Sequence, residues 1–83
     1  MRYFFDVRND GSLAIDSIGL ELIDLKAAAV EAASVLAEKA DDMFSGVLQK
    51  DLSVEIRDAF GTVAMTVALI LRNKSPLMPF RRL

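Results

Sequence analysis

Two short segments of the chain repeat one arrangement of charged residues, FDVRNDG at 5–11 and VEIRDAFG at 54–61. In each segment an acid and an arginine stand two positions apart, and a glycine follows. Two arginines on one surface would suit a duplicated anion site, with Arg8 and Arg57 as its ligands. The pattern is also typical of a half-buried hairpin strand with an outward acid–arginine row. We favour this structural interpretation, because solvated charges on strands are the common case.

The structural interpretation predicts how the charges pair. Strand alternation places Asp6 and Arg8 on one side of the first segment, with apolar residues on the other. It places Glu55 and Arg57 in the same way on the second segment. If the two strands are neighbours, acid–arginine pairs between them would each add roughly 0.2–1 kcal/mol to stability.

The residue types that most catalytic sites need are missing from the sequence. It has no histidine and no cysteine, so the commonest general base, thiolate chemistry and zinc ligation are excluded. The serines have no histidine to activate them, and no GxGxxG, Walker or GxSxG motif occurs. DVRNDG resembles the start of a calcium loop, but Arg8 and Ser17 stand where that loop needs acidic ligands. We therefore expect no catalytic residues, no metal and no cofactor, and a protein that is not an enzyme.

Composition indicates one small domain. A chain of 83 residues buries only about 60–65% of its unfolded surface when it folds. Its hydrophobic content of 53% is above the usual globular share, so we expect some apolar surface to be covered by another molecule or segment. The net charge of −2 gives no long-range attraction for nucleic acid or anionic lipid. The longest apolar run, 63–71, is about half the length of a membrane-spanning helix. We expect a cytoplasmic protein with no membrane association.

Periodicity places the elements along the chain. Residues 2–8 alternate as a strand, 13–15 and 20–22 are short extended pieces, and 52–57 and 62–72 are two further strands. Residues 25–45 have helical period, with Asp24 as the N-cap and Gly46 as the stop. The apolar helix face comprises Leu25, Ala29, Ala32, Leu36, Ala40, Met43 and Val47. Turns are predicted at 9–11, where Gly11 can take positive φ, at 16–19, and at 58–61.

These elements predict an α+β fold. It consists of a small, mainly antiparallel sheet of three or four strands with one long helix packed on one face, in the order β-β-α-β-β. The domain spans residues 1–72, and 73–83 form an irregular C-terminal tail. We expect the helix to lie along the strand at 62–72, because the two have similar lengths.

Two surfaces are candidates for binding. The helix is expected to cover Tyr3, Phe5, Val7, Val63, Met65, Val67 and Leu69. The other sheet face would then present Phe4, Ala64, Ala68 and Ile70, which suggests a second subunit, although isolated apolar surface residues are also ordinary. In the tail, Leu77, Met78 and Phe80 would dock on the parent domain, on a second copy or on an unknown protein partner. Two arginines, at 81 and 82, are too few for nucleic-acid binding.

Three blocks of this sequence, in order, resemble a family of short uncharacterised bacterial proteins, a domain of unknown function. The blocks are RYFFDVRNDG at 2–11, DSIGLELIDLKAA at 16–28 and VEIRDAFGTV at 54–63, against family patterns YFFxVRDG, DxxGxELPDLxxA, an alanine-rich helix and IxDxxG. The chain departs by an inserted Asn9 and by Ile23 in place of proline. The resemblance covers roughly residues 2–70 and implies the layout but no activity. Its recurrent residues correspond to Arg8, Asp16, Gly19, Glu21, Asp24, Asp58 and Gly61.

We conclude from the sequence that the protein is a non-enzymatic interaction or scaffold module that forms a homodimer through a sheet face, a sheet edge or the tail. The alternative, from another class, is a small nucleic-acid-binding regulator of the antitoxin kind, which would use Arg8, Arg57 and the tail arginines. A third possibility is a binder of a small ligand, which a metabolite would stabilise against heat.

Overall fold

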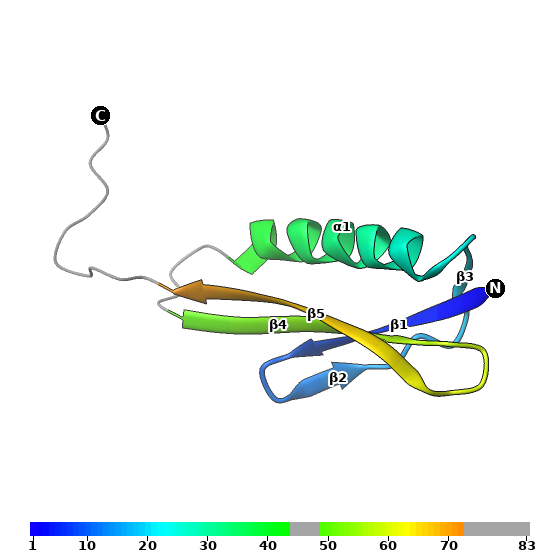
Figure 1. The fold of residues 1–83 in the computed structure, drawn as a ribbon. Helices are drawn as coiled ribbons and strands as arrows, with labels where there is room; N and C mark the ends of the chain where they lie inside the picture. The colour runs from blue at the N-terminus through cyan, green and yellow to red at the C-terminus, as the bar shows by residue number, and fades with distance from the viewer. Residues whose placement is uncertain (44–48, 73–83) are drawn as a thin grey trace, which may run out of the picture.

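The computed structural model describes residues 1–43 and 49–72 of the chain. The elements follow the order β-β-β-α-β-β, and their bounds are β1 Arg2–Asn9, β2 Ser12–Ala14, β3 Leu20–Glu21, α1 Leu25–Met43, β4 Gln49–Arg57 and β5 Val63–Arg72. The strand pairs are antiparallel, and α1 lies across one face of the sheet (Figure 1). The predicted α+β class with one helix on the sheet is confirmed. Part of the predicted extended piece at 20–22 forms the strand β3, so the sheet of the described residues has five strands, more than the three or four that we predicted.

The sheet has the order β2-β1-β4-β5, with β3 added beside β1. The start of β1 pairs with β3 and its end pairs with β2, so both short strands lie along the same side of β1. The other side of β1 pairs with β4, and β4 pairs with β5. Within the described residues β5 pairs with β4 alone, which leaves the long C-terminal strand at an edge of the sheet.

The hydrophobic core lies between α1 and the inner face of β1 and β4. Its buried members are Tyr3, Phe5, Ala28, Ala32, Leu36, Leu52, Val54 and Ile56. The predicted inward alternation of both strands is therefore confirmed. Three of these residues come from the helix, and two of them are alanines, which allow its backbone to approach the sheet closely.

The position of the helix differs from our expectation. It packs on β4 as well as β5, and it does not follow β5 alone. As a result Val67 and Leu69 are partly buried beneath its flank, whereas Val63 and Met65 are 49% and 36% exposed. On the helix itself Ala28 is fully buried, whereas we had placed its neighbour Ala29 on the buried face.

Caps and turns define the element boundaries. The Asp24 carboxylate accepts a hydrogen bond from the Ala27 amide at 2.9 Å, so the predicted N-cap is confirmed. The helix ends at Met43, and the predicted stop at Gly46 lies outside the described residues, as does Val47. In the first hairpin Asp10, not Gly11, has positive φ, at 54°. An aspartate tolerates this conformation better than most residues, because its short polar side chain bonds locally.

The turn between β4 and β5 forms where DAFG predicts it. The Gly61 amide donates to the Asp58 carbonyl at 3.0 Å, and the Asp58 carboxylate accepts from the amides of Phe60 and Thr62 at 2.9 and 3.0 Å. Gly61 has a φ of +87°, which explains the glycine. This turn returns the chain as β5 along β4.

Candidate functional site

The acid–arginine row of the outer sheet face forms a compact ion pair. β1 and β4 are neighbours in a register that places Phe4 opposite Arg57 and Asp6 opposite Glu55. Arg57 reaches diagonally to Asp6, with Nε–Oδ2 at 2.6 Å and Nη2–Oδ1 at 3.1 Å. The guanidinium lies 5.0 Å from the centroid of the Phe4 ring. The predicted cross-strand pairing is confirmed, in its diagonal form.

Asp6 is not solvated, contrary to our expectation for the outer row. It is only 3% exposed, because the turn that follows β2 lies over it. The Asp16 amide donates to Asp6 Oδ1 at 2.9 Å, and Arg57 Nη2 donates to the Asp16 carbonyl at 2.8 Å. Asp6 therefore joins β1, β4 and this turn through one buried carboxylate.

The Asp16 carboxylate organises the turn itself. Its Oδ1 accepts from the amides of Ile18 and Gly19 at 3.0 and 3.1 Å, and its Oδ2 accepts from the Phe5 amide at 3.0 Å. Gly19 has a φ of +75° and lies so close to β1 that an added Cβ would be 2.7 Å from the Tyr3 carbonyl oxygen. The predicted turn at 16–19 thus attaches to the outer face of β1.

Both carboxylates are held ionised by these contacts. The hydrogen bonds from Arg57 lower the pKa of Asp6, and they outweigh the opposing effect of burial. Burial is the largest influence on Asp16 and would raise its pKa. Its amide hydrogen bonds and the charge of Arg57 together leave that pKa below its ordinary value. Asp6 in turn raises the pKa of Arg57. The cluster therefore stays charged at neutral pH.

Acid unfolding is expected to follow from these two aspartates. Because their folded-state pKa values lie below the ordinary value of 3.8, their contribution is fully present above the unfolded pKa and is lost as the pH falls through the folded values. We expect the free energy of unfolding to decline below about pH 4. Urea unfolding followed by far-UV circular dichroism from pH 7 to pH 3, at one protein concentration, would measure it. A flat profile down to pH 3 would contradict the assignment.

The two arginines of the hypothetical anion site do not converge. Arg8 lies opposite Ser53, four strand positions from the Phe4–Arg57 pair, which corresponds to about 13 Å. Its Nη2 is 3.4 Å from Glu55 Oε2. Each arginine is therefore neutralised by its own acid, which is the structural interpretation of the doubled pattern.

The predicted interaction residues of the outer face are only partly brought together. Phe4 is half-buried beneath Arg57 and against Gly19, so it is not part of an open surface. Ala64, Ala68 and Ile70 are exposed on β5. Glu55 lies beside them on β4, and Arg8 lies one strand further away on β1. The three tail candidates, Leu77, Met78 and Phe80, lie outside the described residues.

The most unusual surface is β5 itself. From Val63 to Ile70 none of its side chains is buried, although the sequence VAMTVALI contains one polar residue and no charge. By contrast, β4 alternates between buried and partly exposed residues from Leu52 to Arg57, as a half-buried strand does. A strand that is apolar on both faces normally occupies the interior of a sheet. β5 has this composition but lies at an edge.

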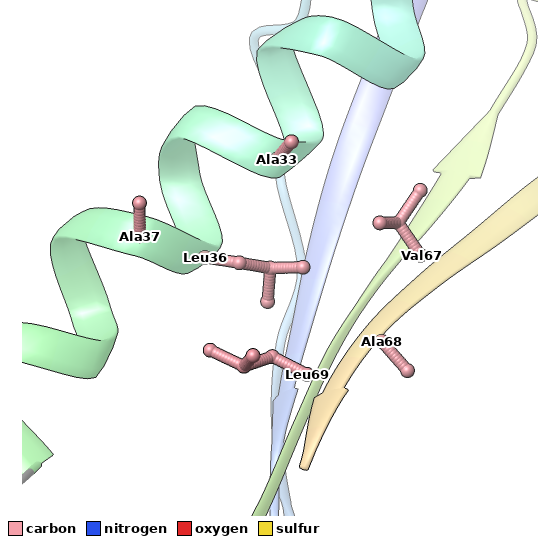
Figure 2. Close-up of a pocket in the computed structure, with 6 residues that line it drawn as sticks. All are labelled: Ala33, Leu36, Ala37, Val67, Ala68 and Leu69. Atoms are coloured by element: carbon pink, nitrogen blue, oxygen red, sulfur yellow. The ribbon is translucent and has the colours of Figure 1, made fainter. Parts of the chain in front are cut away.

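A shallow apolar groove lies between this edge and the helix. Its volume is about 240 Å³, and its lining consists of Ala33, Leu36, Ala37, Val67, Ala68 and Leu69. Figure 2 shows Leu36 and Leu69 pointing toward each other between α1 and β5, while Ala68 points away from the helix. No polar side chain lines the groove, so it suits an apolar occupant and no charged ligand.

Comparison with known families gives one result. A domain of unknown function, DUF6894, matches residues 2–70. The chain belongs to the DUF6894 family. Comparisons with curated proteins and with solved structures give no match.

Most residues that the resemblance singled out in this DUF6894 domain have structural contacts. Asp16 and Asp58 bond turn amides, Gly19 and Gly61 have positive φ, and Asp24 caps the helix. Glu21 lies 2.7 Å from the N-terminal amine, which lowers its pKa. These contacts agree with the prediction that most of the set are turn or cap positions.

Other classes of site find no support in the described part of this DUF6894 domain. Residues 1–43 and 49–72 contain no group of three or more acidic side chains placed to hold a metal ion. No helix within the same residues is long and apolar enough to cross a membrane. Sequence reasoning missed the groove and the cover over Asp6. The only signal for the latter was the Asp-x-x-Gly spacing of Asp16 and Gly19, which we interpreted as a turn alone.

Proposed function

We propose that this DUF6894 domain is a non-enzymatic interaction module that self-associates by strand addition at the free edge of β5. The supporting observation is the conflict between composition and position: VAMTVALI is apolar on both faces, yet it lies at an edge with exposed side chains. Open edges of this kind are normally blunted by charge, proline or a bulge. β5 has no charge or proline before Arg72, and the one irregularity of its pairing is at Ile56/Arg57, near its start.

The edge is a better candidate than the other two surfaces predicted from sequence. On the outer face the exposed apolar residues of β5 are separated from the exposed Leu13 of β2 by Glu55 on β4 and Arg8 on β1. Stacking two such faces would bury charges at a cost. Pairing along the edge requires no charge to be buried, and it gives partners to backbone groups of β5 that pair with no other strand within the described residues.

The non-enzymatic part of the proposal is supported by the state of the reactive groups. The chain lacks histidine and cysteine. Asp6 and Arg57 bond each other, and the Asp16 carboxylate is occupied by three backbone amides. Side chains whose polar atoms are already bonded within the protein have little capacity to bind or transform a substrate.

We propose that the recurrent blocks of DUF6894 are the three quoted above, and that the protein is bacterial and cytoplasmic. The blocks coincide with structural units: β1, the turn at 16–19 leading to the helix N-cap, and the β4–β5 hairpin. Absence of cysteine suits a reducing compartment.

A pair of lysine substitutions tests the edge against the face. Ala68 and Ser53 are direct neighbours on the outer face, Ala68 on β5 and Ser53 one strand inward. Ala68→Lys places a charge on the edge and is expected to weaken self-association at least about tenfold, whereas Ser53→Lys leaves it nearly unchanged. Light scattering from about 1 μM to about 1 mM would measure the mass, against 9.1 kDa for one chain.

Other outcomes of this experiment identify other surfaces. A wild-type chain that stays monomeric throughout the range contradicts self-association. Equal weakening by both lysines indicates the outer face. A full-length variant with Leu77, Met78 and Phe80 changed to serine is expected to associate like wild type. Salt-sensitive retention of DNA that is lost on replacing Arg8 and Arg57 would instead support the nucleic-acid regulator.

A further inference from the structure

We infer that the partner of β5 is β5 of a second copy, paired antiparallel about a two-fold axis perpendicular to the sheet, with the two α1 helices packed side by side. This inference rests on the proposed function and adds to it the orientation and a second contact layer. It places Val30, Ala33 and Ala37 of the helix in the interface, in addition to the strand.

The two possible orientations of β5 pairing have different consequences for the helices. Antiparallel pairing of two identical edges rotates one copy within the plane of the sheet, so both helices stay on the same face. Parallel pairing turns one copy over, so the helices lie on opposite faces and each groove stays open to solvent. The flank of the helix that faces the edge therefore reveals which orientation the chain suits.

The two flanks of α1 differ in charge. At 100° per residue, one side of the buried positions carries Lys26, Val30, Ala33 and Ala37. Ala33 and Ala37 line the groove above β5, which identifies this side as the one facing the free edge. Val30 is 63% exposed there. The opposite flank carries Glu31 and Glu38. Between Val30 and Ala40 the flank that faces the edge carries no charge, and its one lysine, Lys26, lies near the start of the helix. In an antiparallel dimer the starts of the two helices lie at opposite ends, so the uncharged middle of the flank and of the strand meets its copy without charge repulsion.

The spacing of helices in such a dimer is sterically suitable. Strands lie about 4.8 Å apart, and a helix centred between β4 and β5 would be about 4.8 Å from the two-fold axis. The two helix axes would then be about 10 Å apart, at the upper end of the 8–10 Å that packed helices adopt. Alanines at the contact allow this distance, and the side chains from both copies would fill the 240 Å³ grooves.

A lysine pair on the helix tests the second layer. Ala33 and Ser34 are adjacent and exposed, but Ser34 points away from both the sheet and the free edge. Ala33→Lys is expected to weaken association at least about tenfold, while Ser34→Lys, which adds the same charge, leaves it within about twofold. Far-UV circular dichroism would check that both variants keep their helix. Equal association of Ala33→Lys and wild type would overturn the inference.

A distance measurement tests the orientation directly. The chain has no cysteine, so Thr62→Cys provides a single site for a nitroxide directly before β5. With the two-fold axis near Val67, antiparallel pairing separates the two labels by about 30 Å, whereas parallel pairing brings them within about 10–15 Å. A short distance in a dimer that Ala68→Lys dissociates would overturn the antiparallel arrangement and leave the proposed function standing. A wild-type monomer would overturn both.

Discussion

Replacing Asp6 with alanine is expected to lower the free energy of unfolding by about 3 kcal/mol, since it removes three hydrogen bonds from a carboxylate that is 3% exposed. The Asp16 amide would lose its acceptor beneath the turn. For a domain of this size that loss corresponds to a decrease in Tm of about 15 °C. Urea unfolding at a fixed protein concentration, monitored by circular dichroism, would measure the change.

Glu55 supplies the matched control for this substitution. It lies directly opposite Asp6 on the same face and also pairs with an arginine, Arg8, but that pair is exposed and 3.4 Å long. Glu55→Ala is expected to change stability by less than about 1 kcal/mol. The Asp6→Ala variant should also lose stability less steeply on acidification than wild type, because one of the two low-pKa carboxylates is gone. Equal losses of stability in the two alanine variants would show that the burial of Asp6 does not increase its contribution to the free energy of unfolding.

Replacing Gly19 with alanine is expected to cost about 3 kcal/mol or more, from two separate causes. A φ of +75° is unfavourable for alanine by about 1–2 kcal/mol. In addition, the new Cβ would lie 2.7 Å from the Tyr3 carbonyl oxygen and 2.9 Å from the Phe4 ring. Tyr3 belongs to the core and Phe4 supports Arg57, so neither moves without disturbing the ion pair.

The other glycines in the described residues separate strain from contact. Gly61 also has positive φ, at +87°, but nothing lies within 4 Å of the point that a Cβ would occupy, so Gly61→Ala is expected to cost only the 1–2 kcal/mol or so of strain. Gly11 has neither feature, and Gly11→Ala is expected to be neutral within about 0.5 kcal/mol. In the same urea measurements the loss of stability is expected to be largest for the Gly19 variant, smaller for the Gly61 variant and smallest for the Gly11 variant. A Gly19 variant no worse than the Gly61 variant would contradict close packing of the turn on β1.

Features that depend on neighbours in the chain could be predicted from the sequence. The alternation of β1 and β4, the period of α1 and the cap at Asp24 follow from side-chain direction and from hydrogen bonds within a few residues. The turn at Asp58 follows in the same way. The first hairpin is an instructive exception, because both Asp10 and Gly11 tolerate positive φ, and composition alone does not decide between them.

The candidate site could be predicted only in part. Complementary charge on two alternating strands was sufficient to predict acid–arginine pairs between them, but not that Asp6 pairs with Arg57, 51 positions further along the chain. The burial of Asp6 was not predictable, because it depends on a turn ten residues further along the chain that attaches to β1 in three dimensions. The same turn covers Phe4 and removes it from the surface that we predicted.

By itself, the sequence determined which side chains share a strand face or a helix flank, where the chain turns, and that β5 is apolar on both faces; these properties depend on residue type and local period. Only the tertiary structure decided that β5 lies at an edge, that the helix centres on β4 and β5 together, and that Asp6 is enclosed. The physical reason is that strand order and cover arise from contacts between distant segments, which local periodicity does not encode. The exposed apolar edge, and with it the proposed pairing of two copies, follows from that strand order.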